Sequence, residues 1–144
     1  MNNERAYPAA GLMRRIAALS YDILLVGSIL MVVTLVIVAL RGGQPVAPGN
    51  LLYQLGLIGA TGGFFVGFWV RGGQTLGMRA WRLRVQRDSG SALTWKTGLI
   101  RFAAGTLSVA TCGLGFIWLL VDPQHLTWHD RIAGTSVVVL PKKK

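Results

Sequence analysis

The sequence has few of the residues from which most catalytic and metal sites are built. It contains one cysteine, two histidines and five acidic residues among 144 positions. The lone Cys112, inside an apolar run, excludes an internal disulfide and a cysteine zinc cluster. No nucleophile–base pair, phosphate-binding loop or paired catalytic carboxylates can be found. We therefore expect neither enzyme activity nor a cofactor.

The two histidines allow one weak metal hypothesis. His125 and His129 are spaced by one helical turn, and Asp130 follows directly. Two imidazoles and a carboxylate can hold a divalent ion. Because the chain has no further histidine, we predict no metal site and keep this pair only as a weak candidate.

Charged residues are also scarce, at 14% of the chain against roughly 25% in soluble domains. The runs 23–40, 51–70 and 102–121 contain no Asp, Glu, Lys, Arg or His. Each is near the roughly 20 residues that a helix needs to cross a bilayer. The sequence therefore predicts a mainly α-helical, multi-pass membrane protein.

We expect one domain over residues 1–144, with a first spanning helix at about 12–40 and a second at about 51–70. The third apolar segment, about 98–121, allows two interpretations. It could be a straight span, or a re-entrant hairpin broken by the glycines of Thr111-Cys112-Gly113-Leu114-Gly115. We read the first helix as retained, because Asp22 and the length of the stretch do not fit a signal peptide.

The positive charge is concentrated beside these helices. The segment 71–97 holds six basic residues against Asp88, for about +5, whereas the connector 41–50 holds only Arg41. This is the positive-inside pattern of an inner-membrane protein, and it predicts cytoplasmic N- and C-termini. Nucleic acid is not an expected partner. Anionic lipid head groups are, through a basic surface formed by Arg79, Arg82, Arg84, Lys142, Lys143 and Lys144.

A small β element is predicted outside the apolar segments. Residues 82–87 continue an alternation of polar and apolar side chains, and Ser136–Leu140 is a β-branched run within the tail 122–144. Because a single strand cannot satisfy its own backbone groups, we predict that Leu83–Arg87 pairs with Ser136–Leu140 in the cytoplasm. This pairing favours the re-entrant hairpin, since a straight third span would place the C-terminus outside.

Three glycines form a ridge on the second helix. Gly59, Gly63 and Gly67 recur at four-residue spacing. Small residues at this spacing allow close helix packing in lipid. We expect the ridge to pack within the monomer, with homodimerisation as the alternative.

Asp22 is the most unusual residue, because it lies inside an apolar helix. An unpaired carboxylate at membrane depth costs a few kcal/mol. Two interpretations remain open: an interfacial Asp that reaches water, or an Asp paired within the bundle. We favour the second and expect one polar cluster, functional or structural, at the cytoplasmic boundary. Its members would be Arg15, Asp22, Arg101, Asp122, Asp130 and Arg131.

Several of these residues lie in a pattern that resembles the RDD family of bacterial membrane proteins. The likeness runs through 14–22, Gly73-Gln74-Thr75-Leu76-Gly77-Met78, Arg101 and 129–138. The resemblance maps the family's arginine to Arg15, its first aspartate to Asp22, and its second to Asp130, with Asp122 as the alternative. The family's molecular role is largely undefined, although solute or ion transport and cation/proton exchange are associated with it.

Two functions therefore stay under consideration. The first is transport of ions or small solutes, with Asp22 and Asp130 as exchangeable cation or proton ligands and Arg15 tuning their charge. Too few helices are present to enclose a conduit, so this hypothesis requires an oligomer or a membrane-protein partner. The second is a non-catalytic membrane module that binds a partner or anionic lipid through its basic cytoplasmic face.

Overall fold

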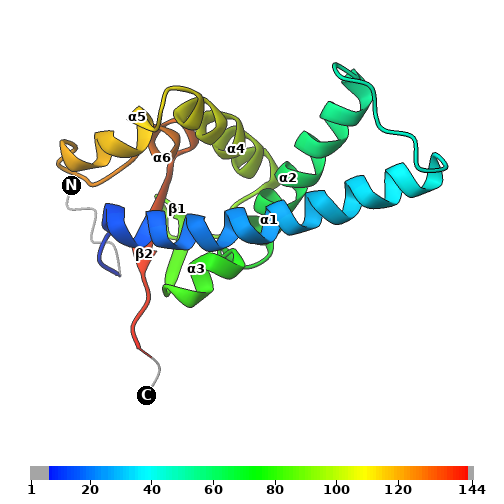
Figure 1. Cartoon of the computed structure of the whole chain (residues 1–144). Helices are drawn as coiled ribbons and strands as arrows, with labels where there is room; N and C mark the ends of the chain where they lie inside the picture. The colour runs from blue at the N-terminus through cyan, green and yellow to red at the C-terminus, as the bar shows by residue number, and fades with distance from the viewer. Residues whose placement is uncertain (1–6, 143–144) are drawn as a thin grey trace.

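The protein is mainly helical, with one small antiparallel sheet (Figure 1). The computed structural model describes residues 7–142. Its elements, in chain order, are α1 (Leu12–Leu40), α2 (Leu51–Gly72), α3 (Leu76–Ala80), β1 (Leu83–Arg87), α4 (Trp95–Ala110), α5 (Leu114–Ile117), the 3₁₀ helix η1 (Trp118–Leu120), α6 (Trp128–Ala133) and β2 (Thr135–Val139).

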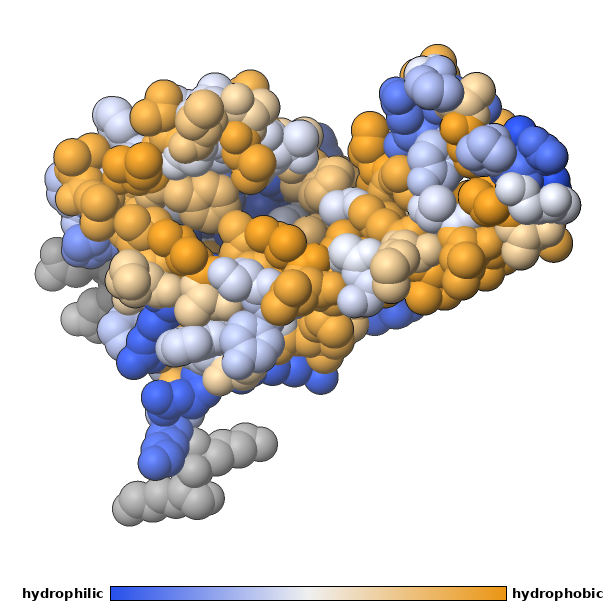
Figure 2. All heavy atoms as spheres, in the orientation of Figure 1, coloured by the Kyte–Doolittle hydropathy of each residue, from blue (hydrophilic) through white to orange (hydrophobic). Residues whose placement is uncertain are grey.

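The helices α1 and α2 are each long and apolar enough to cross a membrane, as predicted. Their outward faces carry exposed leucine, isoleucine, valine and methionine side chains, and Figure 2 shows this hydrophobic surface along α1. Such a surface is unfavourable in water and suits a lipid environment. At their shared end, the Thr34 and Tyr53 hydroxyls are hydrogen-bonded at 2.7 Å.

The third apolar segment is bent and is not a straight helix. The axis of α4 and that of the unit formed by α5 and η1 differ by 106°, across a break of at most four residues. Cys112 and Gly113 in this break both have positive φ, at 57° and 80°. The interruption therefore falls in the glycine-containing stretch where the sequence predicts it. Glycine tolerates this backbone conformation because it has no Cβ.

The predicted strand pairing is confirmed. Leu83 of β1 is opposite Val139 of β2, and Arg87 is opposite Thr135. The second strand begins one residue earlier than expected, and Arg82 lies in the preceding turn instead of the strand.

The N-terminal segment lies along the other edge of β2. Ala10 N–H donates to Val137 O, and Val139 N–H donates to Pro8 O, both at 2.9 Å. The start of α1, the α2–α4 connector and the C-terminal strand therefore meet on one side of the molecule. Because β2 pairs with β1, the chain before α4 and the chain after α6 meet in the same sheet.

The expected packing of the glycine ridge within the monomer is wrong. A Cβ built on Gly59, Gly63 or Gly67 would meet no atom within 4 Å. The neighbouring Gly62 faces α4 instead, where an added Cβ would be 3.2 Å from the Phe102 ring. The rotation of α2 about its axis directs Gly62, and not the ridge, toward α4. The four-residue spacing of the glycines does not reveal this rotation.

Candidate functional site

Asp130 is the centre of a buried charged triad. Its Oδ2 accepts a hydrogen bond from Arg15 Nη1, and its Oδ1 accepts one from Arg101 Nη1, both at 2.5 Å. Asp130 is fully buried, and the two arginines are 6% and 4% exposed. One carboxylate thereby joins α1, α4 and α6, which lie far apart in the sequence.

Local sequence holds this carboxylate in position. Thr127 precedes α6 and accepts a hydrogen bond from Asp130 N–H at 3.3 Å, while Asp130 Oδ2 accepts one from Thr127 N–H at 3.1 Å. This reciprocal pair is a capping box. Burial alone would raise the pKa of Asp130. The charges on Arg101 and Arg15 nevertheless hold this pKa well below its usual range. The carboxylate is therefore ionised, and both of its oxygens accept hydrogen bonds from arginine.

Arg15 also donates hydrogen bonds to backbone carbonyl groups of two other segments. Its Nε donates to Ala10 O at 3.0 Å, and its Nη2 donates to His125 O at 3.2 Å. These bonds connect the N-terminal edge of the sheet and the loop before α6 to the same guanidinium. The planar guanidinium suits such multiple contacts because its donors have fixed directions.

Arg101 uses only part of its donor set. Its Nη1 also donates to Thr135 Oγ1 at 2.6 Å, and its Cζ lies 5.1 Å from the centroid of the Trp69 ring. Among residues 7–142, its Nε has no hydrogen-bond partner although it is buried, and the same is true of Trp69 Nε1. An unsatisfied buried polar group typically costs about 1–3 kcal/mol.

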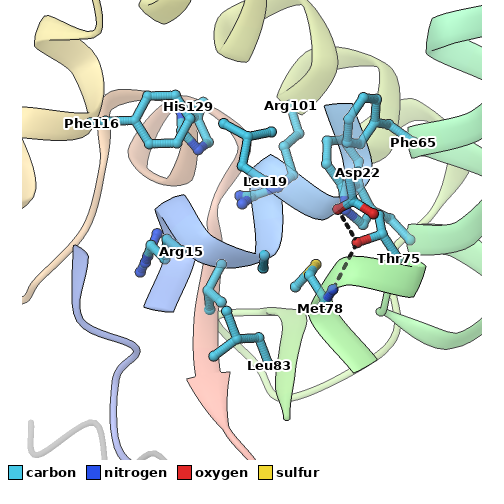
Figure 3. Close-up of a pocket in the computed structure, with 13 residues that line it drawn as sticks. Arg15, Leu19, Asp22, Phe65, Thr75, Met78, Leu83, Arg101, Phe116 and His129 are labelled. Carbon is cyan, nitrogen blue, oxygen red and sulfur yellow. Dashed lines mark hydrogen bonds between the residues drawn. The ribbon is translucent and has the colours of Figure 1, made fainter. Parts of the chain in front are cut away.

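Asp22 has a different set of partners. It is buried in α1, and its Oδ2 accepts a bond from the Thr75 hydroxyl at 2.5 Å (Figure 3). Its Oδ1 accepts one from Gly77 N–H at 2.8 Å. Thr75 in turn caps α3 by accepting from Met78 N–H at 3.2 Å. The carboxylate therefore lies at the N-terminal end of α3, where backbone N–H groups favour negative charge.

Asp122 and Arg131 form a third group near the start of α6. Asp122 is buried and is ion-paired with Arg131, whose side chain is about half exposed. Burial raises the pKa of Asp122, but the hydrogen bond from Leu126 N–H and the Arg131 guanidinium outweigh this effect and leave the pKa below its usual value.

The six residues expected in one cluster are thus divided among three hydrogen-bonded groups. Arg15, Arg101 and Asp130 come together, whereas Asp22 makes no ion pair within 4 Å among the residues described. Arg15 and Asp22 are roughly 10 Å apart along the helix axis, at 1.5 Å per residue. The α3 N-terminus occupies the place beside Asp22 where we expected a guanidinium.

The Asp22 group and the Asp130 triad both contribute side chains to the wall of one cavity of about 80 Å³. Arg15, Asp22 and Arg101 line it, with apolar side chains that include Leu19, Phe65 and Phe116 (Figure 3). Figure 2 shows hydrophilic atoms at the floor of a hollow between α1 and the α4–α5 region, with hydrophobic residues around it. The charged groups therefore face a small space in apolar surroundings.

The two histidines do not converge on a site. His129 is buried, with its ring centroid 4.8 Å from that of Phe116 and its Nδ1 3.4 Å from the Ser108 hydroxyl. Burial and the charge on Arg101 lower the pKa of His129 to about 3, so the ring is neutral. His125 is exposed. Among residues 7–142, no three His, Cys, Asp or Glu side chains are grouped to hold a metal.

The predicted basic surface is exposed where the structure describes it. Arg79, Arg82, Arg84 and Lys142 are exposed, and none of them forms an ion pair within residues 7–142. Lys143 and Lys144 lie outside the described residues. The arginines belong to the α3–β1 region, on the side of the molecule where the sheet lies.

Sequence reasoning missed Thr75, Trp69 and Thr135. A threonine immediately before a helix is a recognisable start signal, so Thr75 could have been identified as an N-cap. Trp69 and Thr135 gave no such signal. Their roles depend on the packing of α2 and β2 against α4.

Comparison with known families adds an independent result. Residues 9–134, which include Arg15, Asp22, Arg101, Asp122 and Asp130, match the RDD family. No curated protein and no solved structure matches the chain significantly. The match covers most of the 144 residues and agrees with the resemblance noted from the sequence. The chain is a member of the RDD family.

Proposed function

We propose that this protein transports a small ion or solute across the bacterial inner membrane. The observation that carries the proposal is the cavity in which Asp22 and Arg101 face one space surrounded by apolar helices. Ionisable groups at membrane depth are costly, and those present usually mark a pathway for ions or protons. An ordinary packing role would be filled more cheaply by apolar side chains.

Asp22 is the exchangeable group in this proposal, and Asp130 is a positioning group. Both Asp130 oxygens accept bonds from guanidinium groups, so a proton or cation would have to break two ion pairs. Within the described part of the chain, the Asp22 oxygens accept hydrogen bonds only from the neutral donors Thr75 and Gly77. Asp22 can therefore change its charge at a smaller cost to the fold.

Transport requires more than one copy of the chain or a membrane-protein partner. Two long helices and one bent segment do not enclose a path. On α2, a Cβ added to Gly59, Gly63 or Gly67 would meet no atom of residues 7–142 within 4 Å, so this face is not closely packed. Small residues on an open helix face permit close approach by another helix. This face supports assembly into an oligomer.

The proposed orientation places both termini and the basic surface in the cytoplasm. The arginines of the α3–β1 region are exposed on the side where the N-terminal segment and β2 meet, and positively charged segments remain cytoplasmic. A reporter enzyme that is active only in the cytoplasm should be active when fused after Lys144. The same fusion after Gly43, in the α1–α2 connector, should be inactive. The reverse pattern would contradict the orientation, whereas inactivity of both fusions would contradict the re-entrant path of α4–η1.

Replacement of Asp22 by Asn tests the transport function. The substitution keeps the shape and one acceptor oxygen but removes the exchangeable charge. We expect the loss of most pH- and sodium-dependent flux in proteoliposomes, with the protein still folded in detergent. Asp88→Asn is the matched control, because Asp88 is an exposed carboxylate outside the cavity, and it should retain wild-type flux.

Equal flux from wild type and Asp22→Asn would reject this role for Asp22. Absence of flux from both would instead favour the second function, a module that binds anionic lipid or a partner protein. The exposed, unpaired Arg79, Arg82 and Arg84 support that alternative. A module of that kind should be indifferent to Asp22→Asn unless the substitution disturbs its assembly.

A further inference from the structure

A second pocket, which shares no lining residue with the cavity of the candidate site, lies at the C-terminal end of α2. Its volume is about 190 Å³, and two arginines line it, Arg71 from the last turn of α2 and Arg79 from α3. Among residues 7–142, no acidic residue lines this α2 pocket, and neither arginine forms an ion pair. Two exposed cationic side chains therefore border one space that supplies no counter-charge.

The rest of the wall of the α2 pocket is apolar. Gly63 and Gly67 form part of it, together with Phe64 and Phe68, whose ring centroids are 5.0 Å apart. A Cβ added to either glycine would meet no described atom within 4 Å. Because Gly63, Gly67 and Arg71 are spaced by four residues, they lie on nearly the same face of the helix. The pocket therefore has an apolar part along α2 and a cationic part at the end of the helix.

The position of the α2 pocket relative to the bilayer indicates the ligand. The helix is long and apolar enough to cross a membrane, so Arg71 in its last turn lies at the level of the lipid head groups. In the proposed orientation this level belongs to the cytoplasmic leaflet, where basic pockets between membrane helices bind anionic head groups. Guanidinium groups form strong, charge-assisted hydrogen bonds with phosphate.

We propose that the α2 pocket binds one anionic phospholipid of the cytoplasmic leaflet. The lipid phosphate lies between Arg71 and Arg79 and supplies the missing counter-charge. One acyl chain lies over Gly63 and Gly67 and covers the apolar part. The site differs from the basic surface expected from the sequence, because it holds a single lipid and includes Arg71. The inference goes beyond the proposed function and requires no transport.

A lipid in this position is compatible with assembly of α2 against another copy of the chain. Gly59 is also open, but it does not line the pocket and lies one turn further from Arg71 than Gly63 does. Helices packed in a membrane cross at an angle. A helix that contacts α2 at Gly59 therefore diverges from it toward Arg71, and the lipid fills the wedge between the two helices.

Native mass spectrometry of the full-length protein in detergent tests the site. The probes are dioleoyl phosphatidylglycerol, dioleoyl phosphatidylcholine with the same chains, and glycerol phosphate, which has no chains. We expect one phosphatidylglycerol per chain to bind at a lower concentration than any further lipid. Phosphatidylcholine should bind more weakly because its choline group neutralises the phosphate, and glycerol phosphate should bind more weakly because it buries no apolar surface. Absence of a distinct first phosphatidylglycerol, or equal binding of any two probes, would overturn the proposal.

Arg71→Gln and Arg79→Gln test the cationic part. Each variant removes one guanidinium group from the phosphate, so the midpoint for the first lipid should rise about tenfold or more, as for lost hydrogen bonds to a charged group. Arg82→Gln is the matched control, because Arg82 is also exposed and unpaired within residues 7–142 but does not line the pocket. It should leave the midpoint unchanged. An equal shift in all three variants would indicate diffuse attraction to a basic surface and would reject the site.

Gly67→Leu tests the apolar part without a change of charge. The added side chain would occupy the space assigned to the acyl chain, so the midpoint should again rise about tenfold. Gly59→Leu, outside the pocket, should leave lipid binding unchanged. If Gly67→Leu alters the oligomeric state and leaves lipid binding intact, a second copy occupies the pocket and the proposal is wrong. None of these variants changes a residue of the Asp22 cavity, so lipid binding and flux are tested independently.

Discussion

Replacement of Asp130 by Asn should lower the free energy of unfolding by about 3–5 kcal/mol, the usual cost of removing one partner from a buried ion pair. The substitution leaves Arg15 and Arg101 buried without a counter-charge, and it weakens the capping box of α6. The measurement is chemical denaturation in a mild detergent, followed by circular dichroism.

Asp88→Asn is again the control, because it removes a carboxylate that is exposed at the end of β1. Its effect should be within about 0.5 kcal/mol, as for most surface substitutions. A loss below about 1 kcal/mol for Asp130→Asn would contradict the structural role of the triad. The arginines would then be solvated or paired in another way.

Replacement of Gly77 by Ala should also destabilise the protein. An added Cβ would collide with the backbone carbonyl of Ala18 and would lie 2.9 Å from Asp22 Cγ. The backbone of α1 cannot move aside as a flexible side chain could. Overpacking of this kind typically costs about 1–3 kcal/mol, occasionally more. The same denaturation assay should therefore show a clear loss of stability.

Gly105→Ala is the matched control for this prediction. Gly105 lies in the helical interior of α4, and a Cβ added there would meet no described atom within 4 Å. The change should be neutral or stabilising by up to about 1 kcal/mol, because alanine favours the helix more than glycine. Equal losses from Gly77→Ala and Gly105→Ala would contradict the tight α1–α3 contact.

Close contact between α1 and α3 also explains the placement of Asp22. The absence of a side chain at Gly77 lets its N–H reach the carboxylate at 2.8 Å, and Thr75 supplies a second donor. The first turn of a short helix is thereby docked onto a spanning helix. The same contact fixes the connector between α2 and β1 beside the cavity.

Much of the fold could be predicted because it depends on local patterns. The long apolar runs predicted α1 and α2, the glycines at 111–115 predicted the break in the third segment, and β-branched alternation predicted the paired strands. These signals are set by hydrophobicity, backbone freedom and residue propensity, which each short segment carries independently. Three candidate residues, Arg15, Arg101 and Asp130, could also be identified, because charges next to apolar helices are conspicuous.

By itself, the sequence determined that the chain has apolar helices suited to lipid, the bounds of α1 and α2 to within two residues, and the set of charged residues beside them. Only the tertiary structure decided which of those charges meet. Asp22 pairs with a hydroxyl and a backbone N–H, whereas Asp130 takes both arginines. The glycine ridge is left open by the same packing. The physical reason is that ion pairs and close helix contacts depend on side-chain directions to within an ångström or two. Those directions follow from how rotated helices and a returning strand pack together, and no single segment encodes them.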